Sequence, residues 1–294
     1  MKKKTLIFGN LLLLMMLFSC NTSPQDRTIP FEGIENAREM GGLVMQDGRS
    51  IRPGKLVRSG SLNKASDKDV SLLKDRFQLT DVFDFRFDAE VAGAPDREID
   101  GVRNTHLSTL PQALVDGFTA GRSDTSQFQV SGFMERLAEH AFNPRAQEMG
   151  RRLYPAIVSD PTSQQRYGAF LRGVLEADGG VLWHCSQGKD RCGWGAAFVL
   201  AALGASRETI VEDFDLSNVS YADQVDAISQ KVVEMGGGEE ELGFIRAMVG
   251  VNTENFKSTL DLIDSQYGSL STYLEKALGF TAQDQEHLRS KLLK

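Results

Sequence analysis

The sequence predicts an α/β fold, and three consecutive segments between residues 163 and 204 carry this prediction. The first, SQQRYGAFLRGVLEADGG, spaces its apolar residues along one face of a helix and ends at the glycine pair Gly179 and Gly180. The second, GGVLWHC, is an apolar run typical of a buried strand. The third, RCGWGAAFVLAALG, indicates a buried, alanine-rich helix that ends at Gly204. In such an arrangement a ligand is expected at the carboxyl end of the strand.

Further segments fit the same class. LTDVFDF at 79–85 predicts a second buried strand. Ser206 is placed to cap a helix over residues 207–218, because its hydroxyl can accept a hydrogen bond from a first-turn N–H.

Two regions predict helices without strands. The amphipathic segments at 132–142 and 146–158 indicate a lid-like helical insertion over the site. Residues 222–294 indicate a helical C-terminal region that is interrupted at GGG (236–238) and at YGS (267–269).

The N-terminus predicts export and not a part of the fold. MKKK is positively charged, LIFGNLLLLMMLF is an apolar run too short to span a bilayer comfortably, and LFSC ends at Cys20. This pattern resembles the lipobox of bacterial lipoproteins; the alternative is a secretory signal with an incidental cysteine. It implies a signal peptide at 1–19, lipidation of Cys20 and a tether at 20–30, and it leaves one domain over 31–294. We therefore expect an exported lipoprotein, anchored on the periplasmic side of a membrane or at the cell surface.

Composition excludes several classes of protein. The hydrophobic content of 41% and charged content of 25% are those of an ordinary globular chain. The net charge of -7 argues against nucleic-acid binding, which requires a basic face. The four histidines show no paired spacing and there is no C-x-x-C, so we expect neither a metal ion nor another cofactor. Besides Cys20 only Cys185 and Cys192 remain, too few for a disulfide scaffold.

The reactive residues are concentrated between Cys185 and Arg191, which are separated by five residues. Five residues wrapped tightly before a helix can turn their N–H groups inward as an anion-binding nest, and the helix N-terminus adds partial positive charge. Arg191 can donate two hydrogen bonds to phosphate oxygens. This environment is expected to stabilise a Cys185 thiolate. Gly188 is expected to let the backbone approach the anion without an intervening Cβ.

Two other interpretations of the loop are weaker. A cysteine after a buried strand is commonly a small core residue, but SQGKDR is too polar for a core. A nucleotide-binding P-loop would need glycine at position 183, which is Trp183. The loop therefore predicts a thiolate anion site.

HCSQGKDR resembles the H-C-x-x-G-x-x-R motif of cysteine-dependent protein tyrosine phosphatases. In the fuller form H-C-x-x-G-K-D-R it is similar to the bacterial tyrosine-phosphatase-like family that includes secreted mycobacterial and Listeria lipid/tyrosine phosphatases. Other segments resemble that family in the same order: NAREMGG, DGRSIRPGKLVRSGSL, DFRFDAE and YGSLSTYLEKALGFT. The resemblance covers 31–294 and implies a phosphatase-type fold, with a central, largely parallel sheet flanked by helices.

The resemblance implies a role for each residue of the motif. Cys185 attacks phosphorus and forms a phosphocysteine, while Arg191 and the loop amides hold the phosphoryl oxygens. The general acid is Asp190 or, alternatively, Asp84, which could instead brace its strand in an ion pair with Arg86. The implied phosphate ligands are Ser186, Gln187, Gly188, Lys189, Asp190 and Arg191.

Three neighbouring residues are expected to modulate the site. His184 is expected to hydrogen-bond the backbone and to help lower the thiol pKa. Lys189 is either a second cation, which suits phosphoinositides, or a solvated surface lysine. Cys192 stands where the family usually has serine or threonine, and its weaker donor predicts slower hydrolysis of the phosphoenzyme. Its position also allows a disulfide with Cys185.

The implied activity is hydrolysis of phosphate monoesters, foremost phosphotyrosine, with dual-specificity or phosphoinositide activity also open. The partners are then a phosphorylated protein or peptide or a phosphoinositide, and the membrane through the lipid anchor. Two alternatives remain: a pseudophosphatase that binds phosphate esters without turnover, and a rhodanese-like sulfur transferase, which needs no general acid.

Overall fold

The computed structural model describes residues 27–119 and 133–294. The expected signal peptide at 1–19 and the expected lipidation site Cys20 lie outside these residues. Within the two described ranges, no helix has both the length and the apolar character needed to cross a membrane.

The packed chain begins inside the segment expected as a tether at 20–30. Arg27 is buried and pairs with Asp213 at 2.9 Å. Ile29 is 3% exposed and belongs to an apolar cluster of the core. Residues 27–30 of the expected tether therefore pack against the domain, because one apolar side chain and one paired cation anchor them.

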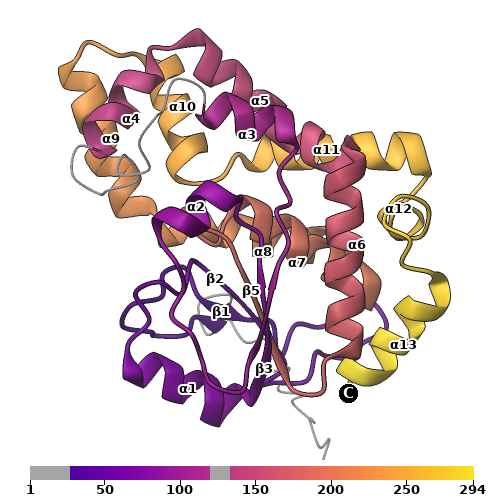
Figure 1. Cartoon of the computed structure of the whole chain (residues 1–294). Helices are drawn as coiled ribbons and strands as arrows, with labels where there is room; N and C mark the ends of the chain where they lie inside the picture. The colour runs from indigo at the N-terminus through magenta and orange to yellow at the C-terminus, as the bar shows by residue number, and fades with distance from the viewer. Residues whose placement is uncertain (1–26, 120–132) are drawn as a thin grey trace, which may run out of the picture.

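A five-stranded sheet forms the centre of the fold (Figure 1). Its strands are β1 (Arg38–Glu39), β2 (Leu56–Ser59), β3 (Leu79–Asp84), β4 (Arg103–His106) and β5 (Gly180–His184). In the order β1-β2-β5-β3-β4, the first pair is antiparallel and the other pairs are parallel. The predicted α/β class with a largely parallel sheet is confirmed. The strand predicted before the motif, β5, takes the middle position.

Thirteen helices surround the sheet within the described residues. They are α1 (Asp67–Phe77), α2 (Asp88–Gly93), α3 (Gln112–Thr119), α4 (Phe133–Ala141), α5 (Pro144–Ser159), α6 (Pro161–Glu176), α7 (Asp190–Leu203), α8 (Arg207–Ser220), α9 (Ala222–Glu234), α10 (Glu239–Val249), α11 (Thr253–Tyr267), α12 (Leu270–Lys276) and α13 (Ala282–Leu292). The predicted end of α7 is confirmed, since Gly204 adopts a left-handed φ of 88°. The predicted cap of α8 is also present: the Ser206 hydroxyl accepts from the Thr209 N–H at 3.2 Å.

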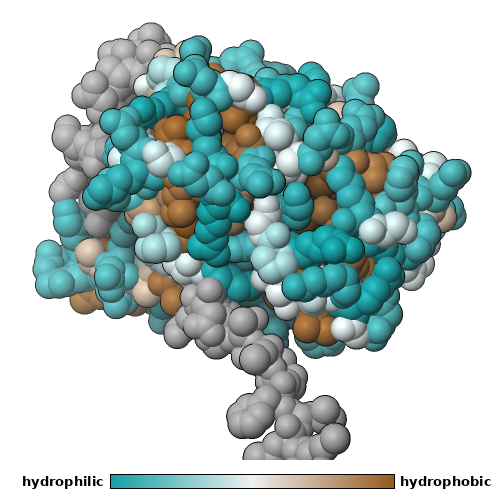
Figure 2. Space-filling model, turned by 90° about the horizontal axis from the view of Figure 1, so that it is seen from below, coloured by the Kyte–Doolittle hydropathy of each residue, from teal (hydrophilic) through white to brown (hydrophobic). Residues whose placement is uncertain are grey.

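Different helices cover the two faces of the sheet. Successive side chains of a strand point to opposite faces, so Trp183 of β5 joins one apolar cluster and Leu182 joins another. The first cluster is built mainly with α6 and α7, and α1 closes the second through Leu73 and Phe77. Seen from below, the surface is mostly hydrophilic and its apolar residues form separate patches (Figure 2).

A helical layer lies over the carboxyl ends of the strands (Figure 1). The predicted insertion is present there as α3, α4 and α5, and α9 and α10 of the C-terminal region pack with α4. Helices α4, α9 and α10 share a small separate core that includes Leu137, Ile228 and Ile245. The layer thus covers the sheet edge at which a ligand is expected.

Candidate active site

The predicted anion-binding loop leaves the carboxyl end of the central strand. β5 ends at His184 and α7 begins at Asp190. Between them lies Cys185, which is 2% exposed. The Gly193 N–H donates to the Lys189 carbonyl at 2.6 Å and closes the first turn of α7. The loop therefore opens onto a helix N-terminus, whose partial positive charge favours an anion.

Two distant side chains hold the carbonyl groups of the loop from outside. Asn36 Nδ2 donates to the carbonyls of Gln187 and Gly188, each at 3.1 Å. Arg58 Nη2, on β2, donates to the carbonyls of Gly188 and Lys189 at 3.0 and 2.9 Å. Carbonyls fixed on the outside of a tight loop leave its N–H groups on the inside.

The N–H groups of residues 186–191 have no acceptor among the described residues. Tyr221 adds a third outer contact, since its hydroxyl donates to the Gln187 carbonyl at 2.8 Å. Backbone N–H groups without a protein partner are rare in a folded interior and indicate a place for water or an anion. The loop therefore has the hydrogen-bonding character of the predicted nest.

Gly188 is required by the backbone and by a neighbouring strand. Its φ is +68°, a left-handed conformation that favours glycine. A Cβ at this position would lie 2.3 Å from the carbonyl carbon of Ser59, at the end of β2. Close approach of the loop to β2 is therefore a reason for glycine in addition to the expected approach of the anion.

One buried carboxylate forms ion pairs with three arginines behind the loop. Asp213 of α8 pairs with Arg27, Arg38 and Arg58 at 2.9, 3.4 and 2.7 Å. Burial and the neighbouring Arg58 lower the pKa of Arg38 to about 9, which still leaves it protonated at neutral pH. Burial raises the pKa of Asp213, but its arginine partners outweigh burial and keep the pKa well below the usual value. Three cations around one anion leave an excess of positive charge behind the nest.

Cys185 is a thiolate at neutral pH. Burial raises the pKa of this thiol, but the hydrogen bond from Cys192 and the charge of Arg191 outweigh burial and lower the pKa to about 5. Burial and the same hydrogen bond raise the pKa of Cys192 well above its usual value. Cys192 therefore remains a thiol, with its Sγ 3.7 and 4.0 Å from the carbonyls of Ser59 and Trp183, and both cysteines are free of disulfides.

We expect the rate of Cys185 alkylation by iodoacetamide to rise with pH and to reach half its maximum near pH 5, because the thiolate is the reactive form. In a Cys192→Ala variant the midpoint should move to higher pH, since a donor to the thiolate is lost. Mass spectrometry of the alkylated peptide measures the rate at each pH. A wild-type midpoint near about 8.5, the value of a free thiol, would contradict this assignment.

Arg191 is oriented by Glu90, a residue for which no role was expected. Its Nη1 and Nη2 donate to the two Glu90 oxygens at 2.6 and 2.8 Å, and the Ser186 hydroxyl donates to the same carboxylate. Burial raises the pKa of Glu90, but Arg191 and Ser186 outweigh burial and lower it. Arg191 Nε has no partner among the described residues, and Nη2 makes only one further contact, at 3.5 Å to Ser186. This edge of the guanidinium can still bind two phosphoryl oxygens.

The two candidate acids have different surroundings. Asp190 lies in the first turn of α7 with its side chain 20% exposed. Asp84 accepts from Arg86 through both of its oxygens, the shortest distance being 2.7 Å. Burial raises the pKa of Asp84, but Arg86 and His184 outweigh burial and lower it. Arg86 therefore holds Asp84 as a carboxylate at 2.7 Å, while Asp190 pairs with Lys189 at the longer distance of 3.7 Å.

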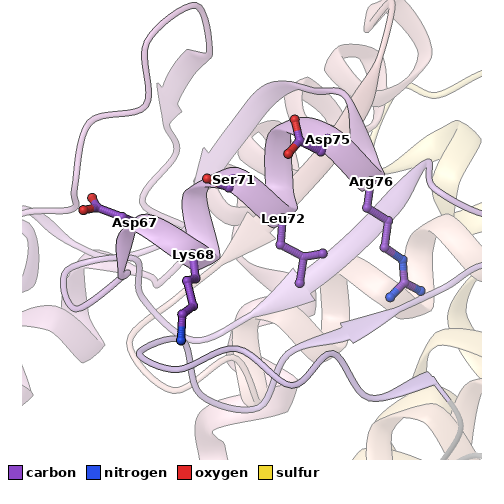
Figure 3. Close-up of a pocket in the computed structure, with 6 residues that line it drawn as sticks. All are labelled: Asp67, Lys68, Ser71, Leu72, Asp75 and Arg76. Carbon is purple, nitrogen blue, oxygen red and sulfur yellow. The ribbon is translucent and has the colours of Figure 1, made fainter.

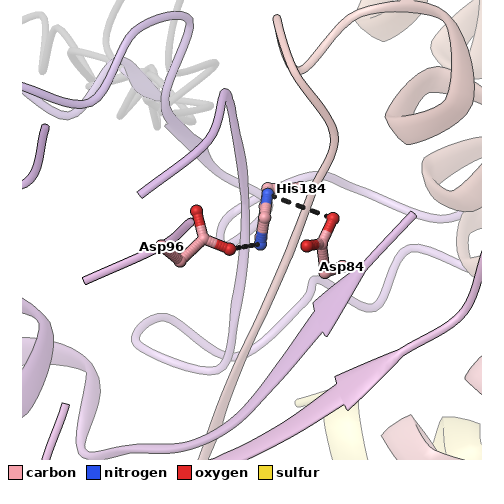
Figure 4. A group of neighbouring side chains, drawn as sticks. All are labelled: Asp84, Asp96 and His184. Atoms are coloured by element: carbon pink, nitrogen blue, oxygen red, sulfur yellow. Dashed lines mark ion pairs between the residues drawn. The ribbon is translucent and has the colours of Figure 1, made fainter. Parts of the chain in front are cut away.

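Asp84 belongs to an ion network that also contains Asp96 and His184 (Figure 4). His184 lies 3.1 Å from Asp96 and 3.8 Å from Asp84, and Arg86 pairs with Asp96 at 2.6 Å. Burial lowers the pKa of His184, but the two carboxylates outweigh burial and raise it. Arg86 pairs with both carboxylates, and the two carboxylates favour the protonated form of His184, so the contacts among these side chains are those of an ion network. The expected backbone contact of His184 is present, with Nδ1 3.4 Å from the Cys185 carbonyl.

Lys189 binds the helical layer above the sheet. Its ammonium group donates to three carbonyls at the end of α10: Met248, Val249 at 3.1 Å and Gly250 at 2.8 Å. An ammonium has three N–H donors, and these contacts use all of them. Lys189 is buried, so the expected alternative of a solvated surface lysine is wrong, and its ammonium group would have to leave these carbonyls to contact a phosphate.

A separate surface depression lies along α1 (Figure 3). It is lined by Asp67, Lys68, Ser71, Leu72, Asp75 and Arg76, all from this helix. Lys68 pairs with Glu32, and Arg76 pairs with Glu39. None of the loop residues lines it, and its cations are already partnered.

The sequence matches the model of the tyrosine phosphatase family over residues 29–294. The chain belongs to this family. It is 30% identical over 269 residues to the triple specificity protein phosphatase PtpB of Mycobacterium tuberculosis, a match that covers 85% of this chain and 95% of that protein. It is 29% identical over 253 residues to a tyrosine-protein phosphatase homologue of Cupriavidus necator, covering 85% of this chain and 84% of the homologue. The predicted family is thus confirmed, and a tyrosine phosphatase is a phosphoric monoester hydrolase.

Sequence reasoning found the reactive part of this tyrosine phosphatase but not its supports. Cys185 lies at the start of the loop, and Asp190 and Arg191 lie in the first turn of α7, which follows it. Glu90 was inside the segment DFRFDAE, and its spacing from Arg86 was the available signal. Tyr154 of α5, whose hydroxyl donates to Asp190 Oδ1 at 2.6 Å, had no signal beyond the apolar face of a helix.

Proposed function

We propose that this tyrosine phosphatase hydrolyses phosphotyrosine in proteins or peptides through a phosphocysteine intermediate. The observation that supports this most directly is the Cys185 thiolate, with its pKa lowered to about 5, at the start of a loop whose N–H groups have no protein acceptor. A nucleophile and a set of oxyanion donors are the two requirements of this chemistry.

In the first step the Cys185 sulfur attacks phosphorus and the phenolic oxygen leaves. The loop amides and the open edge of Arg191 hold the phosphoryl oxygens while charge develops on them. Asp190 gives its proton to the phenolic oxygen, so that tyrosine leaves as a neutral phenol.

In the second step water attacks the phosphocysteine and the Cys185 thiolate leaves. Asp190, now a carboxylate, accepts a proton from the water. The Cys192 thiol donates to the departing sulfur. This thiol also lies 3.7 Å from the Ser59 carbonyl, so its single proton has a second acceptor.

A Cys192→Ser variant is expected to hydrolyse the phosphoenzyme about two- to tenfold faster than the wild type, because a hydroxyl is the stronger donor. Rapid mixing with p-nitrophenyl phosphate separates the burst, which reports phosphoenzyme formation, from the steady state, which reports its hydrolysis. Identical burst and steady-state phases in the two proteins would show that Cys192 does not assist this step.

The proposal is tested with p-nitrophenyl phosphate and a phosphotyrosine peptide, using the wild type and Cys185→Ser. Turnover that depends on Cys185 supports a phosphatase. Binding of the peptide without turnover would indicate a pseudophosphatase. Sulfur transfer from thiosulfate without phosphate release would indicate a rhodanese-like enzyme.

The breadth of substrates is a further part of the proposal. Because the similar protein PtpB is a triple specificity phosphatase, we would test phosphoserine, phosphothreonine and phosphoinositides beside phosphotyrosine. The present contacts of Lys189 with the end of α10 make it unavailable to a second phosphate group, which favours phosphotyrosine. A higher kcat/KM for phosphoinositides than for phosphotyrosine peptides would reverse this preference.

We also propose that the protein is exported and anchored through a lipid on Cys20. The positive segment, the short apolar run and the cysteine at its end support this. In a bacterial host, labelled fatty acid should enter the full chain and should be absent from a Cys20→Ala variant. Equal labelling of the two would exclude this anchor.

A further inference from the structure

Tyr154 of α5 reaches the catalytic loop from the helical insertion. Its hydroxyl donates to Asp190 Oδ1 at 2.6 Å. The side chain is buried, with 2% of the residue exposed. This is a contact between residues 36 positions apart in the chain, and it joins the insertion directly to the loop.

The Tyr154 ring is held in place by aromatic neighbours on three other helices. It makes edge-on contacts with Trp194 of α7, Phe214 of α8 and Phe256 of α11, at centroid distances of 6.2, 5.6 and 6.4 Å. A side chain packed on several sides has little rotamer freedom. The position of the hydroxyl is therefore set by the core.

The direction of the Tyr154 proton is also set. The Asn252 N–H donates to the Tyr154 oxygen at 3.4 Å, so the proton of the hydroxyl is directed to Asp190. Burial and the charge of Asp190 raise the pKa of Tyr154 well above its usual value, so the hydroxyl remains a donor.

With Oδ1 engaged, the other oxygen of Asp190 is the one available for proton transfer. Lys189 Nζ pairs with Oδ2 at 3.7 Å, which is beyond hydrogen-bond distance, so Oδ2 has an ion-pair partner but no hydrogen-bond donor from this side chain. We propose that Tyr154 is a positioning residue, which fixes Asp190 through Oδ1 so that Oδ2 gives a proton to the leaving oxygen and accepts one from the attacking water. This inference rests on the proposed role of Asp190 as general acid.

The test compares two substrates that need different amounts of acid catalysis. Nitrophenolate leaves readily without a proton, whereas the phenolate of phenyl phosphate is a stronger base and needs one. We expect Tyr154→Phe to lower kcat/KM for phenyl phosphate by about tenfold and for p-nitrophenyl phosphate by less than about threefold. The ring and its packing are kept, so the fold should be retained, which thermal unfolding verifies.

Two further variants make the result specific. Tyr273→Phe is the matched control: Tyr273 is also buried, and its hydroxyl donates to the Val158 carbonyl at 2.8 Å, so its removal should leave the ratio of the two kcat/KM values unchanged. In an Asp190→Asn background, Tyr154→Phe should not change this ratio further, because the acid is already absent.

Each outcome has a defined meaning. If Tyr154→Phe lowers kcat/KM for both substrates by the same factor, the positioning role is wrong while the phosphatase activity stands. If Asp190→Asn itself leaves the ratio unchanged, Asp190 is not the acid, and both the assignment and the inference are overturned. If the wild type hydrolyses neither ester, the proposed function is wrong.

Discussion

A Cys185→Ser variant is expected to lose phosphatase activity by at least about 10⁴-fold. The wild-type thiolate is formed by lowering the pKa of Cys185 to about 5, whereas a serine hydroxyl in the same place stays protonated and is a poor nucleophile. Release of nitrophenolate from p-nitrophenyl phosphate measures the loss of activity in the variant relative to the wild type.

The same variant should still bind substrate. The loop amides and Arg191 are unchanged, and a negative charge next to the phosphate is removed. Isothermal titration with a phosphotyrosine peptide should therefore give an affinity at least equal to that of the wild type under conditions without turnover. Residual activity above about 1% of the wild type would mean that another group serves as nucleophile.

The second large effect is expected for Arg191→Lys, which should lower kcat/KM by about 10²- to 10³-fold. Lysine keeps the charge but has no planar fork, so it cannot bind Glu90 and two phosphoryl oxygens at once. Steady-state kinetics with p-nitrophenyl phosphate measures the effect.

Arg172→Lys is the matched control, because Arg172 is an exposed arginine of α6 that contacts the Gly279 carbonyl. It should retain wild-type kcat/KM. A loss below tenfold in Arg191→Lys would show that positive charge alone, without the fork, accounts for phosphate binding.

The fold and the reactive loop could be predicted because both are encoded locally. The strand before Cys185 and the helix after it are continuous in sequence, and the caps at Gly204 and Ser206 depend on single residues. The five-residue spacing from Cys185 to Arg191 determines the length of the loop, and a loop of this length can turn its N–H groups inward to bind an anion.

The supports of the loop could not be predicted, because they come from distant parts of the chain. Asn36, Arg58 and Tyr221 meet at the loop carbonyls only after the sheet and α8 have formed. Their residue types give no signal, since asparagine, arginine and tyrosine are common at surfaces and in ordinary ion pairs.

The contacts of Lys189 could not be predicted either, because its partners are also distant in the chain. Within the motif it suggests a second cation for an anionic ligand, because only the neighbouring residues are visible in the sequence. Its partners are the carbonyls of Val249 and Gly250, about sixty residues later, and these come close only when α10 packs over the sheet.

The outer hydrogen bonds of the loop have a consequence for protein design. A segment from Cys185 to Arg191 transplanted onto another strand and helix would bring its spacing but not the donors to its carbonyls. The unsatisfied carbonyls would then compete for the inner N–H groups or turn toward the anion, and the nest would be lost. A working graft must therefore carry Asn36 and Arg58 with the loop, together with Asp213, whose carboxylate keeps the Arg58 guanidinium in place.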